Sequence, residues 1–167
     1  KAGKIEGVFK QSTFVAPLVL SPGKTTLNRP QTPLPPFAYA TEEVYFHNEK
    51  DHATLCGTLT YPVGFDKKNS QKVPVVLMVT GSGAQNRDEE LFEHKPFAVL
   101  ADYLAKNGIA SLRYDDRGVG KSIGDVRNAT TYNLSLDALA GVEYLKGLGV
   151  FSRVGVLGHS EGATIAL

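Results

Sequence analysis

One serine in the sequence stands where it could act as a nucleophile. Ser160 is the centre of Gly158-His159-Ser160-Glu161-Gly162, which follows a β-branched apolar run and precedes small and apolar residues. Between a buried strand and a helix, this Gly-x-Ser-x-Gly pattern is typical of a nucleophile elbow, a sharp turn that requires tiny neighbours. We expect Gly158 and Gly162 to meet that requirement and the strained turn to hold Ser160 Oγ above a sheet edge. The alternative is a turn with a purely structural role.

Two further glycine-rich loops could bind ligands. Residues 80–88 resemble a dinucleotide fingerprint, but Asn86 replaces the third glycine, and the next helix begins too late, near Pro96, to hold a pyrophosphate. Residues 115–122 end like a phosphate-binding loop, but Asp115 occupies the position of its first glycine and would repel phosphate. The first loop is therefore interpreted as a donor of backbone N–H groups to an anion or oxyanion, with a simple glycine turn as the alternative. No cofactor and no metal is predicted.

The elements that must position these loops follow an alternating order. The expected elements are strands over 73–80, 109–115 and 153–160, a helix from Pro96 that ends before Gly108, and a second helix capped by Thr130 or Thr131. Strand, helix, strand, helix, strand is the pattern of a parallel α/β sheet with right-handed crossovers. Two strands at 42–48 and 54–62 read as a preceding hairpin. In such a sheet ligands bind beyond the carboxyl ends of the strands, where all three loops lie.

The beginning of the chain has a different character. Residues 4–20 hold two short β-like runs, and residues 21–41 hold five of the nine prolines, which favours an extended, semi-rigid linker. We predict that residues 1–20 are the end of an upstream β-rich unit, that residues 21–41 are a Pro-rich linker, and that residues 42–167 belong to an α/β domain.

Composition and charge exclude several classes of partner. Hydrophobic residues make up 42% and charged residues 21% of the 167 residues, and the net charge is +1. This balance gives no electrostatic reason to expect nucleic acid or an anionic membrane surface as a partner. No apolar run approaches the ~20 residues that a spanning helix needs. Cys56 is the single cysteine, so it forms no internal disulfide and is expected to be a small buried hydrophobe.

Four ordered motifs resemble the α/β-hydrolase family. They are GSGAQNRDE, HKPFAVLADYL, RYDDRGVGKS and GHSEGA, and the resemblance covers residues 42–167. They are most similar to bacterial members near the serine aminopeptidase and acyl-esterase branches, some of which carry a small β domain in front. The resemblance implies a partial α/β-hydrolase fold, a mostly parallel sheet with an N-terminal hairpin and flanking helices, preceded by the tail of a small β unit.

The resemblance also implies a chemical role for the elbow and the first loop. Ser160 would be the nucleophile, and the backbone N–H of Glu161 would form half of the oxyanion hole. The other half would come from Ser82, with Gly83 as second choice. The implied activity is hydrolysis of a small-molecule carboxylic ester through an acyl-enzyme. An aminopeptidase or amidase of the same fold, and a non-catalytic scaffold, remain the rivals.

Two pairs of charged residues are expected to brace these loops rather than react. Asp116 and Arg117 would form one ion pair, and Arg87 and Asp88 another. Both pairs adjoin the loops that the resemblance places at the active site.

The base and the acid of a hydrolase are not where the family has them. Their order along the chain is Ser, then Asp or Glu, then His, whereas neither an Asp nor a His follows Ser160. Adjacent side chains on an elbow point apart, so His159 is expected to pack beside the strand rather than act as base. We therefore expect this chain to be the N-terminal part of a larger hydrolase, or a second chain to supply Asp and His. The compartment stays open, with the periplasm or secretion as one option.

Overall fold

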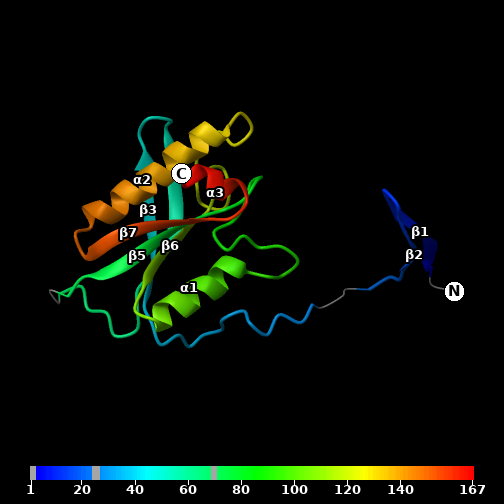
Figure 1. Ribbon diagram of the computed structural model, residues 1–167, viewed down its shortest axis with the longest axis horizontal. Coiled ribbons are helices and arrows are strands. Elements are labelled where there is room, and N and C mark those ends of the chain that lie inside the picture. Colours follow the sequence, from blue (N-terminus) through cyan, green and yellow to red (C-terminus); the bar gives the residue numbers. More distant parts are fainter. Residues whose placement is uncertain (1–2, 24–26, 69–70) are drawn as a thin grey trace.

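A five-stranded mixed sheet forms the centre of the computed structural model, which describes residues 3–23, 27–68 and 71–167 (Figure 1). Its order is β3-β4-β6-β5-β7. Strand β3 pairs antiparallel with β4 and β4 antiparallel with β6, whereas β5 pairs parallel with both β6 and β7. The predicted hairpin and the predicted parallel strands thus join in one α/β sheet. The strands are β3 Thr41–Asn48, β4 Ala53–Thr60, β5 Val73–Val79, β6 Ala110–Tyr114 and β7 Phe151–Gly158.

Helices cover the two faces of this sheet (Figure 1). They are α1 Pro96–Lys106, α2 Thr131–Gly147 and the short α3 Glu161–Ile165. Pro96 opens α1, as predicted, because a proline in the first turn gives up no helical hydrogen bond. Thr130 caps α2 through a capping box with Asn133, in which each side chain accepts the other residue's backbone N–H.

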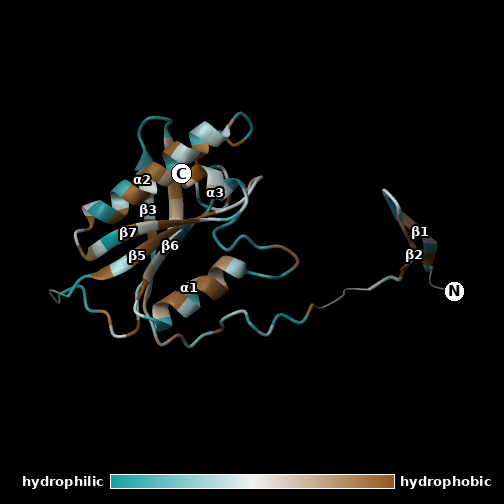
Figure 2. Cartoon of the chain, viewed as in Figure 1, coloured by the Kyte–Doolittle hydropathy of each residue, from teal (hydrophilic) through white to brown (hydrophobic). Residues whose placement is uncertain are grey.

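Strand β5 contributes to two hydrophobic cores, one on each face of the sheet. Leu77 belongs to the larger core with Phe46 and Leu145, whereas Met78 packs with Phe97 of α1 in the smaller one. Successive side chains of a strand point to opposite faces, so a strand covered on both sides must be apolar throughout. This explains the continuous apolar sequence of β5, which Figure 2 shows in the centre of the body.

Strand β7 is the edge strand of the sheet within the described residues, and Val156 is exposed. The buried face of α2 includes Asp137 and Gly141, while Leu148 is partly exposed. A Cβ on Gly141 would lie 3.1 Å from Leu77 Cδ1, so the missing side chain lets α2 approach β5 closely.

The N-terminal residues form a separate hairpin that lies away from the sheet in Figure 1. Strands β1 Ile5–Gln11 and β2 Phe14–Leu20 pair antiparallel, and most of their apolar side chains are exposed. The two predicted strands are therefore present. Their assignment to an upstream β-rich unit remains a prediction, as do the proposed domain boundaries.

The proline-rich segment runs from this hairpin to β3 without regular structure in its described residues, 27–40. Residues 24–26 of the predicted linker lie outside the described part of the chain. The segment contacts the α/β body, since Tyr39 donates a hydrogen bond to Asp102 of α1 at 3.1 Å. Within the described ranges, no helix is both long enough and apolar enough to cross a membrane.

Candidate active site

Ser160 occupies a strained turn between β7 and α3. Its backbone has φ 53° and ψ −118°, a left-handed conformation that is unfavourable for a residue with a Cβ and is concentrated at functional sites. The N–H of His159 donates to Val79 O at 3.1 Å, which fixes the turn against the end of β5. The predicted order of strand, sharp turn and helix is confirmed.

Both glycines of the elbow are required by close backbone contacts. A Cβ on Gly158 would lie 2.0 Å from Gly162 O, and a Cβ on Gly162 would lie 2.3 Å from Val79 O. Neither distance is possible for a real side chain. The turn therefore requires glycine at both positions, because its backbone packs closely against itself and against the end of β5.

The first glycine-rich loop lies directly against Ser160. A Cβ on Gly81 would be 3.2 Å from Ser160 Cβ. The N–H of Gly81 is bound to Glu89 Oε1 at 2.7 Å, and the N–H of Gln85 to Asp116 Oδ2 at 2.9 Å. These two amides already have acceptors, so Ser82 and its neighbour Gly83, which has φ 96°, are the loop's candidate donors.

Asp116 holds the two ends of this loop, with contacts that differ from the predicted ion pair. Its carboxylate accepts the Thr80 hydroxyl at 2.9 Å in addition to the Gln85 N–H. Burial raises its pKa from 3.8 to about 6, although both hydrogen bonds favour the charged form. The predicted pairing of Asp116 with Arg117 is therefore wrong, but its bracing of the active-site loop is present.

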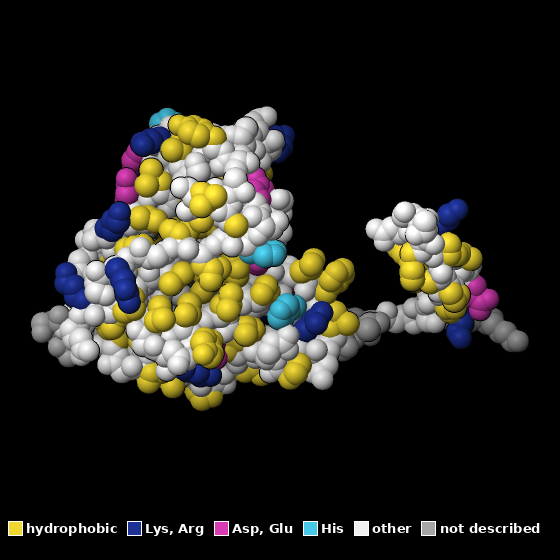
Figure 3. All heavy atoms as spheres, viewed as in Figure 1, with side chains coloured by type: hydrophobic (Ala, Val, Ile, Leu, Met, Phe, Trp, Pro, Cys, Tyr) yellow, Lys and Arg dark blue, Asp and Glu magenta, His cyan; other side chains and the backbone are white. Residues whose placement is uncertain are grey.

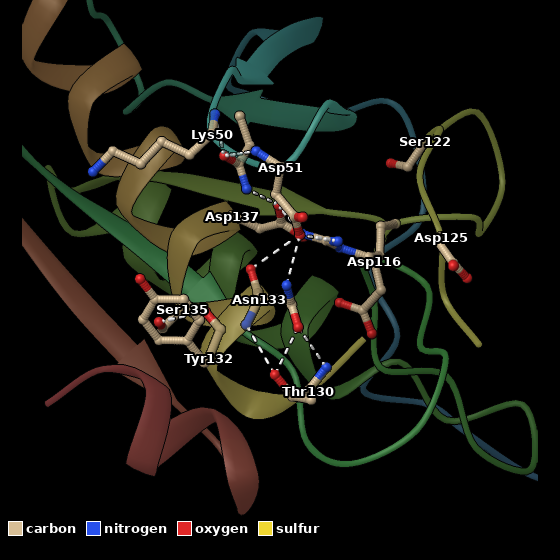
Figure 4. Close-up of polar contacts among 12 residues, drawn as sticks. Lys50, Asp51, Asp116, Ser122, Asp125, Thr130, Tyr132, Asn133, Ser135 and Asp137 are labelled. Carbon is tan, nitrogen blue, oxygen red and sulfur yellow. Dashed lines mark hydrogen bonds and ion pairs between the residues drawn. The ribbon is translucent and has the colours of Figure 1, made fainter. Parts of the chain in front are cut away.

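Arg117 points instead into a buried polar cluster between α2 and the β3–β4 turn. Its guanidinium makes two 2.8 Å contacts with Asp137, a further ion pair with Asp51, and a hydrogen bond to Asn133 O. Asn48 donates to the same Asp137 carboxylate at 2.7 Å. Figure 4 shows Asp51, Asn133 and Asp137 converging on this point, apart from Asp116. A buried charge needs such partners to offset its lost hydration.

The second predicted ion pair also has different partners. Arg87 binds Asp115, with Nη2 to Oδ2 at 2.5 Å, while Asp88 pairs with Arg113. Arg87 further donates to Cys56 Sγ at 3.2 Å, and Cys56 is buried as predicted. The first loop is thus joined to the loop after β6 and to two strands. Residues adjacent in sequence were paired in the prediction, whereas the folded chain pairs residues about 25 positions apart.

His159 is not packed beside the strand, contrary to expectation. Its side chain is 66% exposed, and its Nδ1 lies 2.8 Å from Glu89 Oε1. Glu89 is itself buried, with a left-handed φ of 51°. Sequence reasoning missed this carboxylate, because a contact across 70 residues leaves no local pattern. The only available signal was its position at the end of the first glycine-rich loop.

These residues surround a cavity of about 420 Å³. It combines the nucleophile, the first loop and an apolar segment that precedes α1. Its lining includes Arg29, Ser82, Leu91, Phe92, Pro96 and Ser160. Within residues 3–23, 27–68 and 71–167, no group of three or more His, Cys, Asp or Glu side chains could hold a metal ion.

The site places a strained serine at the carboxyl end of parallel strands, between two glycines and beside a glycine-rich loop. This arrangement is characteristic of α/β hydrolases. The comparisons with known proteins agree. Residues 93–167 match the family model described as serine aminopeptidase, S33. The chain is 31% identical over 166 residues to esterase EstD of Thermotoga maritima, covering 99% of this chain and 35% of that protein. It is 44% identical over 72 residues to an acyl transferase of Shewanella hanedai, covering 42% of this chain and 23% of that one.

Solved structures support the same assignment. Est1E of Butyrivibrio proteoclasticus with bound ferulic acid superposes with a TM-score of 0.60 at 25% identity, over 73% of this chain and 44% of that one. An esterase of Pyrococcus furiosus gives a TM-score of 0.59 at 25% identity, over 77% and 43%. The family match, the esterase relative and these structures together support an α/β-hydrolase assignment. The chain spans about a third of the length of EstD and less than half of these two structures.

Proposed function

We propose that the protein is a serine hydrolase that cleaves carboxylic esters through an acyl-enzyme on Ser160. The observation that carries this proposal is the left-handed backbone of Ser160 inside an elbow closed by Gly158 and Gly162. Ser160 Oγ would attack the ester carbonyl and expel the alcohol, and water would then release the acid from the acylated serine.

The oxyanion of the tetrahedral intermediate would be stabilised by two backbone N–H groups. Glu161 offers one, because the first amides of a helix have no partner within it. Ser82 offers the other, since the amides of Gly81 and Gln85 are already bound to carboxylates. A donor of this kind is typically worth ~3 to 4 kcal/mol, because it acts on charge that develops only in the transition state.

The general base and its orienting acid would come from outside these 167 residues, either from further residues of a longer chain or from a second chain. His159, the histidine adjacent to the nucleophile, has its Nδ1 bound to Glu89. A serine without its base loses about 10⁶-fold in turnover, so we expect efficient turnover only when the Asp and His are supplied.

Cleavage of amides is the second candidate, because residues 93–167 match the serine aminopeptidase model. Esters and amides share the acyl-enzyme route and differ in the leaving group. Comparing kcat/KM for p-nitrophenyl esters with that for aminoacyl p-nitroanilides separates the two. A ratio that favours the anilides would replace the ester assignment.

The proposal is tested by labelling the full-length protein with a fluorophosphonate probe and locating the adduct by mass spectrometry. We expect labelling at Ser160 and its loss in Ser160→Ala. The matched control is Ser152→Ala, which changes an exposed serine at the other end of β7. Folded protein that hydrolyses neither substrate class and takes up no label at Ser160 would instead be a non-catalytic scaffold.

A further inference from the structure

The segment between Glu89 and Pro96 presents two large apolar side chains beside the nucleophile. Leu91 is 66% exposed and Phe92 is 72% exposed. Both line the cavity that contains Ser160. On the face shown in Figure 3, hydrophobic side chains gather beside histidines near the end of the body that faces the linker. Exposed residues of this size are unfavourable in water and gain free energy when an apolar ligand covers them.

The turn that carries these side chains is closed by its own hydrogen bonds. Leu91 N–H donates to His94 O at 3.0 Å, and His94 N–H donates to Leu91 O at 2.9 Å. Between them, Phe92 and Glu93 have left-handed φ angles of 48° and 62°. Two consecutive non-glycine residues in this region are rare and need support from their surroundings.

That support comes from the proline-rich segment, from residues 63 positions earlier in the chain. Arg29 Nε donates to Phe92 O at 3.2 Å, and Gln31 Nε2 lies 3.1 Å from His94 Nδ1. Arg29 also lines the cavity. The segment before the α/β domain therefore takes part in the wall of the candidate active site and is not only a spacer.

The cavity has a polar, reactive part and an apolar wall, which is formed by the side chains between Glu89 and Pro96. Ser160 and Ser82 belong to the same lining as Leu91, Phe92 and Pro96. Its volume of about 420 Å³ lies within the usual range for small-molecule sites, which are mostly apolar with a few placed polar groups. An acetyl group or a methanol leaving group would leave most of this wall in contact with water.

We propose that residues 89–96, held by Arg29 and Gln31, form a subsite for the acyl part of the ester when that part is a medium-length alkyl chain. Leu91 and Phe92 are its specificity-determining residues, and Arg29 and Gln31 are positioning residues. This inference rests on the proposed esterase function and names its substrate class. Because the wall is apolar, it acts on substrate selection and leaves the chemistry at Ser160 unchanged.

The test compares p-nitrophenyl octanoate with p-nitrophenyl acetate in the full-length protein. One side chain in an apolar pocket changes discrimination by about 10- to 200-fold. We expect Phe92→Ala and Leu91→Ala each to lower kcat/KM for octanoate by about 10-fold, mainly through KM, and to change acetate hydrolysis by less than about twofold. Phe92→Leu, which keeps an apolar side chain, should restore most of the octanoate activity.

The matched control is Tyr103→Ala, which removes an aromatic side chain of similar exposure from α1 outside the cavity. It should leave both esters unaffected. Equal losses for acetate and octanoate in Phe92→Ala, with unchanged thermal stability, would overturn the subsite while leaving the esterase proposal intact. Failure of the parent protein to hydrolyse either ester, together with no label on Ser160, would overturn both.

The role of the proline-rich segment needs its own measurement. Arg29→Ala and Gln31→Ala should reduce the octanoate-to-acetate ratio in the same direction as Phe92→Ala, and should increase proteolytic cleavage near Phe92. A double variant of Arg29 and Phe92 should be less than additive in the octanoate-to-acetate ratio, because both residues act through one wall. Full additivity, or an unchanged ratio in both single variants, would remove Arg29 and Gln31 from the proposal.

Discussion

The tightest backbone contact of the elbow gives its sharpest test, the variant Gly158→Ala. A Cβ at this position would lie 2.0 Å from Gly162 O and 2.5 Å from Ala163 N, both backbone atoms of the turn itself. Real Cβ atoms essentially never approach closer than 3.0 Å, so the turn has to open by about an ångström. Overpacking of this severity costs about 3 kcal/mol, which lowers the melting temperature by roughly 6 to 12 °C for a domain of this size.

The same displacement moves Ser160 away from its oxyanion donors. A misplacement of about 1 Å can reduce the rate about 100-fold, and we expect a fall of this size in the rate of fluorophosphonate labelling. The control is Gly155→Ala on the same strand, where a Cβ would be 4.0 Å from its nearest neighbours. That variant should label at the parental rate and melt within about 2 °C of the parent. If Gly158→Ala melts and labels like Gly155→Ala, the elbow described above is wrong.

Three further predictions concern strain and buried charge. Ser160→Gly should raise the melting temperature by roughly 2 to 4 °C in thermal unfolding, because glycine relieves about 1 kcal/mol of left-handed strain, and Ser160→Ala should not. Asp137→Ala should lower the free energy of unfolding in urea titration by about 3 kcal/mol, because the buried Arg117 keeps only Asp51 as an ion-pair partner; a loss below about 1 kcal/mol would contradict this. Burial raises the pKa of Asp116 to about 6, so its protonation favours the folded state and its stabilising contribution is lost as pH rises through that value. Relative to Asp116→Asn, the parent's free energy of unfolding should fall by about 2 kcal/mol from about pH 4 to pH 7. A pH-independent difference would show that Asp116 titrates normally.

The sequence predicted the elements well because each carried a local signal. Pro96 marked the start of α1, Thr130 or Thr131 was predicted to cap α2, and residues 73–80 were predicted to form the strand observed as β5. The elbow could also be predicted from the sequence, because its backbone geometry allows only glycine at positions 158 and 162. In each case the physical cause acts within a few residues of the chain.

The partners of the charged side chains were not predictable in the same way. Arg117 was expected to pair with its neighbour Asp116 but binds Asp137 of α2. Such pairs depend on which segments the sheet order brings together, and a one-dimensional pattern does not contain that order. The contact of Glu89 with His159 belongs to this class too.

Three unfavourable features of this fold lie at one place, which is an argument for function independent of any relative. The left-handed Ser160, the buried Asp116 and the left-handed Glu89 all lie in loops beyond the carboxyl ends of β5, β6 and β7. Selection for stability alone would readily remove such strain. The single change Ser160→Gly, for example, relieves the left-handed strain at this position with no loss of packing. Since strain of this kind persists where it positions reacting groups, a gain in stability together with a loss of labelling in Ser160→Gly would show that the turn serves chemistry rather than the fold.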